Sequence, residues 1–232
     1  MDYANFTRLP AISSFAGDID FVIFTVTVLV GFWFILTEAV FFYFILKYRK
    51  KNSPKAAYIT GDEPELHKWI SLPHAIVLVF DVLIVVAGVR VWLDVKQTLP
   101  PEPAPHIRVV AQQWAWSFVH PGPDGQLDTA DDIKTVDDLH IQANQKYIWE
   151  LESRDVLHSF SIPAMRMKQD AVPGRVIKGW FDANTPGTYE IQCAEICGIG
   201  HGLMPAKVHV EDAATHMAWM QANSPVTRIA AN

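Results

Sequence analysis

Two long apolar stretches dominate the first hundred positions of the chain. Residues 21–46 carry one formal charge, Glu38, and residues 69–93 form a second apolar stretch with few polar interruptions. About 20 apolar residues suffice for a helix to cross the hydrocarbon core of a bilayer. The pattern therefore predicts a transmembrane hairpin over residues 19–93, with helices at about 19–46 and 69–93.

Charged side chains inside the two apolar stretches are unusual. Glu38, Asp81 and Arg90 would be costly at membrane depth, where such groups usually face other protein or reach towards the interface. Two interpretations stay open, a route for protons or a contact with another membrane subunit, and we favour the contact. Either interpretation points to a larger membrane complex.

Basic residues predict the topology of the hairpin. Residues 47–68 hold six basic side chains, whereas only Arg8 precedes the first stretch and only Lys96 lies just after the second. By the positive-inside rule, the 47–68 loop is cytoplasmic and both termini are exported, including the N-terminal segment 1–18. The six basic residues are Lys47, Arg49, Lys50, Lys51, Lys55 and Lys68.

After a linker with four prolines, residues 94–106, the pattern changes to short strand candidates separated by turn signals. In the last candidate Ala206, Val208 and Val210 share one face, which is the alternation of a half-buried strand. About seven short strands imply an all-β sandwich or barrel over residues 107–212. The candidates are IRVVAQQWAWSF, DLHIQA, YIWELES, HSFSIP, VIKGWFD, GTYEIQC and AKVHVE.

Composition and charge narrow the function of this second part. The chain is 50% apolar and 19% charged, with a net charge of −6. Residues 107–232 hold ten Lys and Arg against fifteen Asp and Glu, a net −5. An acidic exported domain disfavours a nucleic-acid partner and favours a basic protein. Residues 213–232 are expected to form a short helix, capped by Asp212, and a tail.

The densest chemistry lies in residues 193–204, CAEICGIGHGLM. Cys193, Cys197, His201 and Met204 follow one another at C-x3-C-x3-H-x2-M spacing. Thiolate, imidazole and thioether together are the ligand set of copper, whereas zinc rarely recruits methionine. We expect three glycines to let the backbone wrap closely around an ion. These glycines are Gly198, Gly200 and Gly202.

A second imidazole must come from elsewhere, and His158 in DVLHSFSIP lies in a suitable strand candidate. Other interpretations stay open for single residues, because Cys193 and Cys197 could form a disulfide and Met204 could be a core residue. The joint spacing favours the metal site. The other histidines have no comparable neighbours in sequence, and we expect surface or hydrogen-bonding roles for His67, His74, His106, His120, His140, His209 and His216.

The chain resembles subunit II of the haem-copper cytochrome c oxidases. The resemblance rests on QQWAWSF, DVLHSFSIP, DAVPGR and CAEICGIGHGLMP, which occur in the expected order. It implies a two-helix transmembrane hairpin followed by an all-β, cupredoxin-like Greek-key sandwich that holds the dinuclear CuA copper centre. By the same resemblance, Cys193 and Cys197 bridge both coppers, and His158 and His201 each bind one.

The resemblance implies further roles around this centre. Met204 and the backbone carbonyl of Glu195 would be weak copper ligands, and the Glu195 side chain would bind a magnesium ion shared with subunit I. Trp114 would be the residue through which electrons arrive. Asp155 and Asp170 would belong to an acidic docking face for cytochrome c, although a plain solvated surface fits them equally well.

The function implied by the resemblance is electron transfer in a terminal oxidase. The chain would accept electrons from cytochrome c, or a cytochrome c domain, and pass them to haem in subunit I for oxygen reduction coupled to proton pumping. Its other partners would be further oxidase subunits and the lipid of a bacterial inner membrane, with both termini and the copper domain on the periplasmic side. The alternative is a CuA-containing subunit of a nitric-oxide or nitrous-oxide reductase.

Two regions depart from the family pattern. Leu66 stands where the family often has a glutamate for proton uptake, and Glu65 precedes it, so the pattern does not support that role for Glu65. The insertion PGPDGQLDTADD spaces Asp124, Asp128 and Asp131 like part of a calcium loop. It lacks the bidentate glutamate of a full calcium loop, so we favour a solvated turn over a calcium site. A larger docking surface for cytochrome c is the third interpretation of the insertion.

Overall fold

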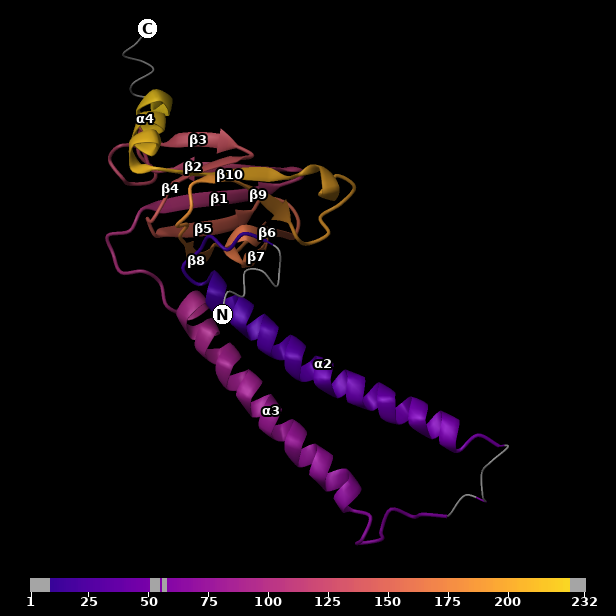
Figure 1. Ribbon diagram of the computed structural model, residues 1–232. Helices are drawn as coiled ribbons and strands as arrows, with labels where there is room; N and C mark the ends of the chain where they lie inside the picture. The colour runs from indigo at the N-terminus through magenta and orange to yellow at the C-terminus, as the bar shows by residue number, and fades with distance from the viewer. Residues whose placement is uncertain (1–8, 51–54, 56–57, 226–232) are drawn as a thin grey trace. The chain divides into compact units, whose positions relative to one another are not determined.

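The computed structural model describes residues 9–50, 55 and 58–225. The chain forms two compact units, a helical hairpin and an all-β sandwich, which is the expected fold class (Figure 1). The hairpin comprises Asp20–Trp92. The sandwich unit comprises the chain from Leu93 onward together with the described residues before position 20.

Both helices of the hairpin are long and apolar enough to cross a membrane. Helix α2 covers Ala16–Lys47 and helix α3 covers Lys68–Trp92. Most of their large apolar side chains are exposed in the isolated chain, so these surfaces are available to lipid or to other proteins. Trp33 of α2 and Phe80 of α3 are in ring contact, with centroids 6.1 Å apart.

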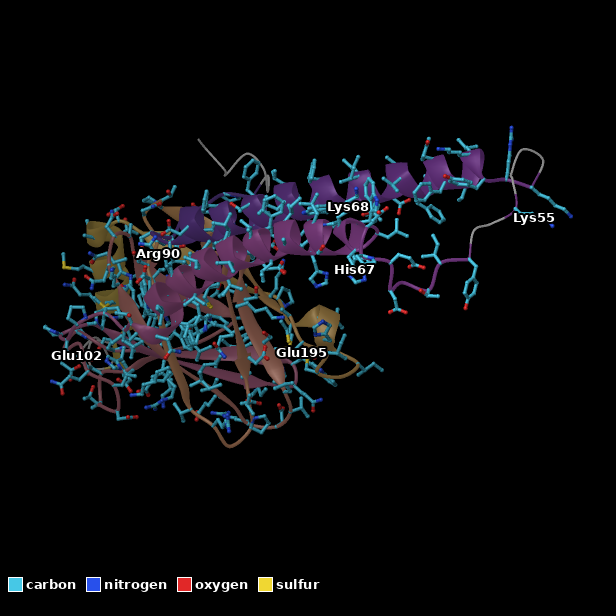
Figure 2. All side chains as sticks on the ribbon, turned by 90° about the horizontal axis from the view of Figure 1, so that it is seen from below. Lys55, His67, Lys68, Arg90, Glu102 and Glu195 are labelled. Atoms are coloured by element: carbon cyan, nitrogen blue, oxygen red, sulfur yellow. The ribbon has the colours of Figure 1, made fainter. Side chains whose placement is uncertain are left out.

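The end of α3 differs from the expected linker. Arg90 lies in the last turn of α3, and a π-helical turn, η1 at Leu93–Gln97, follows directly (Figure 2). The N–H of Thr98 donates to the carbonyl of Leu93 at 3.0 Å, which closes this turn. The linker over residues 94–106 therefore begins as helix, and its proline-rich part starts only afterwards.

Within the described residues, ten strands form two five-stranded sheets (Figure 1). The strand orders are β3-β2-β1-β5-β8 and β4-β10-β9-β6-β7, and the pairs β1 with β5 and β4 with β10 are parallel. The strands are β1 (His106–Gln112), β2 (Ala115–His120), β3 (Ile133–Val136), β4 (Asp138–Gln142), β5 (Tyr147–Ser153), β6 (His158–Ile162), β7 (Met167–Ala171), β8 (Ile177–Phe181), β9 (Gly187–Cys193) and β10 (Ala206–Glu211). Two 3-10 turns are η2 (Pro163–Met165) and η3 (His201–Leu203).

Three of these strands depart from the hydrophobic pattern. The single strand expected over residues 107–118 is a hairpin, in which Gln112 pairs with Ala115 and the turn between them holds Gln113 and Trp114. Strands β3 and β7 were not expected. They are only four and five residues long, and their apolar residues do not follow a run of strict alternation that would indicate a strand.

The hydrophobic core lies between the two sheets. Its largest fully buried side chains include Trp116, Trp149, Phe118, Phe160 and Phe181, which come from both sheets. Burying one large apolar side chain stabilises a fold by roughly 1.5–3 kcal/mol. These aromatic residues therefore make the sandwich a rigid support for the loops at its ends.

Residues 9–15, here called the N-terminal strap, close one side of this core. Ile12 is only 1% exposed and belongs to the core cluster. Its N–H donates to the Ala164 carbonyl at 3.0 Å, and its carbonyl accepts from the Asn184 N–H at 2.7 Å. Ser13 Oγ also donates to the Met165 carbonyl at 2.8 Å. The strap is thus part of the sandwich, a role that its sequence did not indicate.

A last helix, α4 at Ala213–Asn223, follows β10. The expected cap is confirmed, because the Asp212 carboxylate accepts from the N–H groups of Ala214 and Thr215. Such a cap satisfies backbone donors that have no partner inside the helix.

Candidate metal centre

Two strands and one loop bring the predicted copper ligands together. Strands β6 and β9 pair antiparallel with Phe160 opposite Cys193. Because β9 ends at Cys193 and the antiparallel β6 begins at His158, both residues lie at the same end of these neighbouring strands. The loop after β9 then returns through Cys197 and η3 to β10. This topology joins residues that are 35 positions apart in the sequence.

The two cysteines lie at the centre of the site. Their Sγ atoms are 3.8 Å apart, and both thiols are free. A disulfide requires about 2.05 Å between the sulfurs, so the disulfide interpretation does not describe this structure. His158 Nδ1 lies 3.9 Å from Cys193 Sγ, and His201 Nδ1 lies 3.6 Å from Cys197 Sγ. Each thiol therefore has its own imidazole.

Two further donors flank the thiols. Met204 Sδ is 3.4 Å from Cys197 Sγ, and the carbonyl oxygen of Glu195 is 3.2 Å from Cys193 Sγ. Ligand atoms of His158, Cys193 and Cys197 all lie within 4.8 Å of one another, which is close enough to hold a metal ion. The described residues contain no other such group of three or more His, Cys, Asp or Glu side chains.

Burial and charge fit a soft cation at this position. Cys197 is 4% exposed, and Met204 and His158 are 1% and 0% exposed. Burial, together with the neighbouring Cys193 thiol, raises the pKa of the Cys197 thiol. A metal ion would replace the thiol protons and offset the cost of two buried thiolates. The donor set of two thiols, two imidazoles and a thioether therefore fits copper.

A second set of residues holds the donors in place, and sequence reasoning missed it. His158 Nε2 lies 2.8 Å from Asp155 Oδ1, an arrangement that orients the Nδ1 side of the ring towards the thiols. The indole N–H of buried Trp116 donates to the Met204 carbonyl at 3.2 Å. Gln113 Nε2 donates to the Cys197 carbonyl at 2.7 Å. The only sequence signal for these contacts was that Asp155 opens the motif DVLHSFSIP and that Gln113 and Trp116 lie in QQWAWSF.

The glycines of the loop make room for Trp114. A Cβ at Gly200 would lie 2.3 Å from Cδ2 of the Trp114 ring, and one at Gly198 would lie 3.3 Å from Cζ2. The Trp114 ring, 38% exposed, therefore lies directly on the loop backbone. Only Gly198 has a left-handed φ, +127°, and nothing lies within 4 Å of a Cβ at Gly202. The contact with Trp114 gives Gly200 a structural reason of its own, and wrapping of the loop around an ion stays a prediction.

The acidic residues near the site have internal partners. The Asp155 carboxylate binds His158 and also accepts from the N–H of Gln113 at 2.6 Å, and Asp170 accepts from Ser159 Oγ at 2.8 Å. Neither is a plain solvated carboxylate. Glu195, labelled in Figure 2, is half-buried, and its carboxylate has no ion pair within the described part of the chain.

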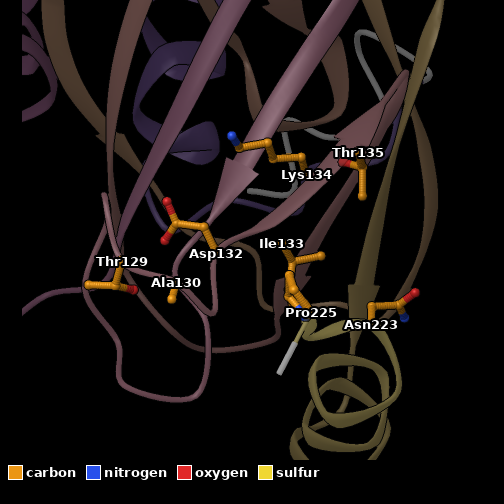
Figure 3. A pocket seen from close by; sticks show the side chains of 8 residues that line it. All are labelled: Thr129, Ala130, Asp132, Ile133, Lys134, Thr135, Asn223 and Pro225. Atoms are coloured by element: carbon orange, nitrogen blue, oxygen red, sulfur yellow. The ribbon is translucent and has the colours of Figure 1, made fainter. Parts of the chain in front are cut away.

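The structure does not gather the proposed calcium ligands. Both oxygens of Asp128 bind the Arg108 guanidinium at 2.9 Å. Asp131 Oδ2 accepts from the Asp124 N–H, and its Oδ1 accepts from Thr129 Oγ1. The end of the insertion instead lines a pocket of about 350 Å³ together with strand β3, Asn223 at the end of α4, and Pro225 (Figure 3). Its contacts are those of a hydrogen-bonded turn.

Four histidines that lacked neighbours in sequence lie together in space. We call His120, His140, His209 and His216 the histidine cluster. His120, His140 and His216 contact the ring of Trp219 of α4, which stacks on His140 with centroids 4.1 Å apart, and His209 stacks on His140. The expected hydrogen-bonding role is confirmed for these four, although the sequence did not indicate that they lie together.

Comparisons with known proteins point to one family. A family profile described as "Cytochrome C oxidase subunit II, periplasmic domain" matches residues 106–211. The "Alternative cytochrome c oxidase subunit 2" of Bradyrhizobium diazoefficiens is 31% identical over 223 residues, covering 84% of this chain and 78% of that protein. The "Probable cytochrome c oxidase subunit 2" of Rickettsia bellii is 28% identical over 235 residues, covering 92% and 82%.

Among solved structures, the crystal structure of the periplasmic domain of cytochrome oxidase subunit II from Bradyrhizobium japonicum is similar to the sandwich. Its TM-score is 0.47 at 26% identity, covering 54% of this chain and 96% of that domain.

Proposed function

Because the chain belongs to the cytochrome c oxidase subunit II family, we propose that its sandwich domain holds the dinuclear CuA centre and receives electrons from cytochrome c. The chain is one subunit of a haem-copper oxidase complex, an oxidoreductase, and the other oxidase subunits are its partners. The comparisons do not favour the reductase alternative.

The observation that carries this proposal is the pair of unbonded sulfurs 3.8 Å apart, each beside its own imidazole nitrogen. Cys193 and Cys197 would bridge two copper ions, and His158 and His201 would each bind one. Met204 and the Glu195 carbonyl would be weak further ligands. Two coppers bridged by two thiolates would supply a one-electron carrier.

The protein contributes a dry and rigid frame for this carrier. His158 is fully buried between Asp155 and Trp116, whose ring lies 6.2 Å from the imidazole, centroid to centroid. The same Trp116 fixes the Met204 backbone through its indole N–H. A frame that moves little between redox states lowers the energy of reorganisation, so transfer is fast at small driving force.

Trp114 is proposed as the residue through which electrons arrive from the donor. Its ring is partly exposed and lies on the loop backbone at Gly198 and Gly200, beside the cysteine that would bridge the coppers. A tryptophan in this position is also a good contact for a partner protein.

The Glu195 carboxylate, without an ion pair in the described chain, is proposed to bind magnesium with subunit I.

We further propose the membrane arrangement that the basic 47–68 loop predicts. The loop is cytoplasmic in this arrangement, and the sandwich with both termini lies on the periplasmic side of a bacterial inner membrane. Electrons would then pass from the periplasmic donor to haem in subunit I, where oxygen reduction is coupled to proton pumping.

Metal analysis of the detergent-solubilised full chain tests the proposal. Two coppers per chain and the purple spectrum of a dinuclear centre are expected, whereas a single copper with one intense blue band would contradict the proposal.

Two ligand variants test the assigned roles. Met204→Leu should keep both coppers and shift their reduction potential, because a weak axial ligand changes the potential of a centre without holding it together. Cys197→Ser should lose the dinuclear centre, because it removes a bridging thiolate. Equal copper loss in both variants would contradict the assigned roles.

A further inference from the structure

Two residues, Asp155 and Gln113, join three segments that surround the proposed centre. These segments are the β1–β2 turn with Gln113 and Trp114, the turn 153–156 after β5, and the loop after β9. The Asp155 carboxylate accepts from the Gln113 N–H across 42 positions, and the Gln113 side chain donates to the Cys197 carbonyl across 84 positions. Asp155 thus reaches the loop after β9 through Gln113.

Asp155 uses both of its oxygens. Oδ2 accepts from the Gln113 N–H at 2.6 Å, and Oδ1 accepts from the Val156 N–H at 2.6 Å and lies 2.8 Å from His158 Nε2. Three polar partners therefore fix the orientation of this one carboxyl group.

The contacts of Gln113 hold the turn that carries Trp114. The residue before it, Gln113, is fixed by its N–H on Asp155 and by its side-chain amide on the Cys197 carbonyl. The Trp114 ring then lies on the loop backbone at Gly200. Arg154 reinforces the contact between the two turns, because its N–H donates to the Ala111 carbonyl at 3.0 Å.

We propose that Asp155 is a positioning residue that orients the copper ligand His158 and the Trp114 turn together. Through His158 it acts on the reduction potential of the centre, and through Gln113 it acts on the path by which electrons arrive. This inference rests on the proposed function. It differs from the docking-face interpretation, in which Asp155 contributes only a negative charge to the surface.

Asp155 would affect the reduction potential because its carboxylate accepts a hydrogen bond from the imidazole N–H of His158. A carboxylate on the far nitrogen makes the metal-bound nitrogen a stronger donor, which stabilises oxidised copper and lowers the reduction potential. Loss of such a partner typically costs about 10–100-fold in metal affinity or activity. A docking charge would instead change the salt dependence of the donor reaction.

Asp155→Asn is the main variant for the test. The amide is nearly isosteric, but its oxygen can accept from only one of His158 and Gln113, and its NH2 meets a donor on the other side. Glu190→Gln is the matched control, because Glu190 is an exposed carboxylate on β9 without an ion pair within the described residues. Both variants remove one negative charge from the sandwich.

Three quantities are measured on the full chain in detergent: the reduction potential of the copper centre, its copper affinity, and the rate at which a thiol reagent modifies Cys197 in the copper-free protein. We expect Asp155→Asn to raise the potential, to weaken copper binding by roughly tenfold, and to speed up thiol modification severalfold. Glu190→Gln should leave all three near the wild-type values. Asp155→Ala should behave like Asp155→Asn, and added acetate should partly restore the potential.

The proposal would be overturned if Asp155→Asn and Glu190→Gln had the same reduction potential, copper affinity and thiol reactivity. If Asp155→Asn changed only the salt dependence of the reaction with the electron donor, Asp155 would be a docking charge. If Asp155→Asn does not fold, Asp155→Ala with and without acetate decides the question. A wild-type chain that binds no copper pair would refute the proposed function instead. The thiol reaction of the copper-free chain would still show whether Asp155 holds the loops.

Discussion

The lack of a side chain at Gly200 leaves space for the Trp114 ring beside the proposed centre. Gly200 has a φ of −90°, which any residue can adopt, so its backbone does not require glycine. The requirement comes from Trp114, because a Cβ at Gly200 would lie 2.3 Å from ring atom Cδ2. Gly202, two residues further, has open space at the same position.

Gly200→Ala is therefore expected to displace the Trp114 ring and to leave the metal ligands in place. Overpacking of this kind typically costs about 1–3 kcal/mol. The rate of reduction by cytochrome c should fall severalfold, while the copper spectrum stays close to that of the wild type. Stopped-flow reduction and absorption spectra measure both quantities. Gly202→Ala is the control and should match the wild type. Equal rates in both alanine variants would show that the ring position does not matter.

Residues of the site differ in how far the sequence could predict them. Cys193, Cys197, His201 and Met204 are close in sequence, so their spacing indicated copper directly. Asp155 and Gln113 act through contacts across 42 and 84 positions, and no local pattern reveals such pairs. Their roles depend on the strand pairing, which short apolar runs do not determine.

At the scale of elements, the N-terminal strap is the least expected part of the fold. Ile12 lies in the core although it belongs to a short segment before the first membrane helix. The hydrophobic pattern of residues 9–15 is too short to predict a core role. The strap also shows that a fragment starting at residue 107 would lack part of the sandwich core.

Ile12→Ala should destabilise the sandwich by about 2–4 kcal/mol, because it removes a buried side chain and leaves a cavity. Leu9→Ala is the control, since Leu9 is 47% exposed and its backbone contacts do not depend on the side chain. Chemical denaturation followed by tryptophan fluorescence measures the free energy of unfolding. A loss below 1 kcal/mol in Ile12→Ala would show that the strap is dispensable.

The histidine cluster attaches α4 to the sandwich. The Glu211 carboxylate joins β4 to α4, because its Oε1 lies 2.8 Å from His140 Nδ1 and its Oε2 lies 3.0 Å from His216 Nδ1. His120 Nε2 accepts the N–H of His140 at 3.0 Å, which requires that nitrogen to be unprotonated. His209 in turn lies 3.0 Å from Asp138. The attachment therefore uses neutral His120.

This attachment makes stability depend on pH. Burial lowers the pKa of His120 to about 3, and burial also lowers the pKa of His140 although Glu211 opposes the shift. A histidine in the unfolded chain has a pKa of about 6.5. Both groups therefore stabilise the fold above pH ~6.5, and this contribution is lost as the pH falls towards their folded values.

We expect the free energy of unfolding to fall by up to ~1.4 kcal/mol per pH unit for each such histidine below pH ~6.5. His120→Gln cannot be protonated and should flatten this dependence, whatever its effect at pH 8. Denaturation between pH 8 and pH 5 gives the slope. His67→Gln, outside the sandwich, is the control. An unchanged slope in His120→Gln would show that other groups cause the acid sensitivity.

At the scale of the whole molecule, the hydrophobic pattern predicted the two units and their fold class correctly. Long apolar stretches and alternating short strands are visible in any single sequence, because they depend on local periodicity. The order of strands in the two sheets depends on long-range pairing. The parallel pairs β1–β5 and β4–β10 join strands separated by long segments, so no turn signal could reveal them.

The topology of the complete chain is the remaining prediction, and it rests on charge alone. Six basic residues in the 47–68 loop, against one on either flank, predict a cytoplasmic loop. Tyr58 is 93% exposed in this loop, and Val136 is 61% exposed on β3 of the sandwich. Cysteines at these two positions should therefore face opposite sides of the membrane.

In copper-loaded cells with a permeabilised outer membrane, an impermeant maleimide should label Val136→Cys and leave Tyr58→Cys unlabelled until the inner membrane is broken. The wild-type chain measures the background from Cys193 and Cys197, which the copper centre would occupy. Labelling of Tyr58→Cys in intact cells would reverse the topology. It would also place the sandwich on the wrong side of the membrane for an exported cytochrome c, so the proposed donor would have to be withdrawn together with the orientation.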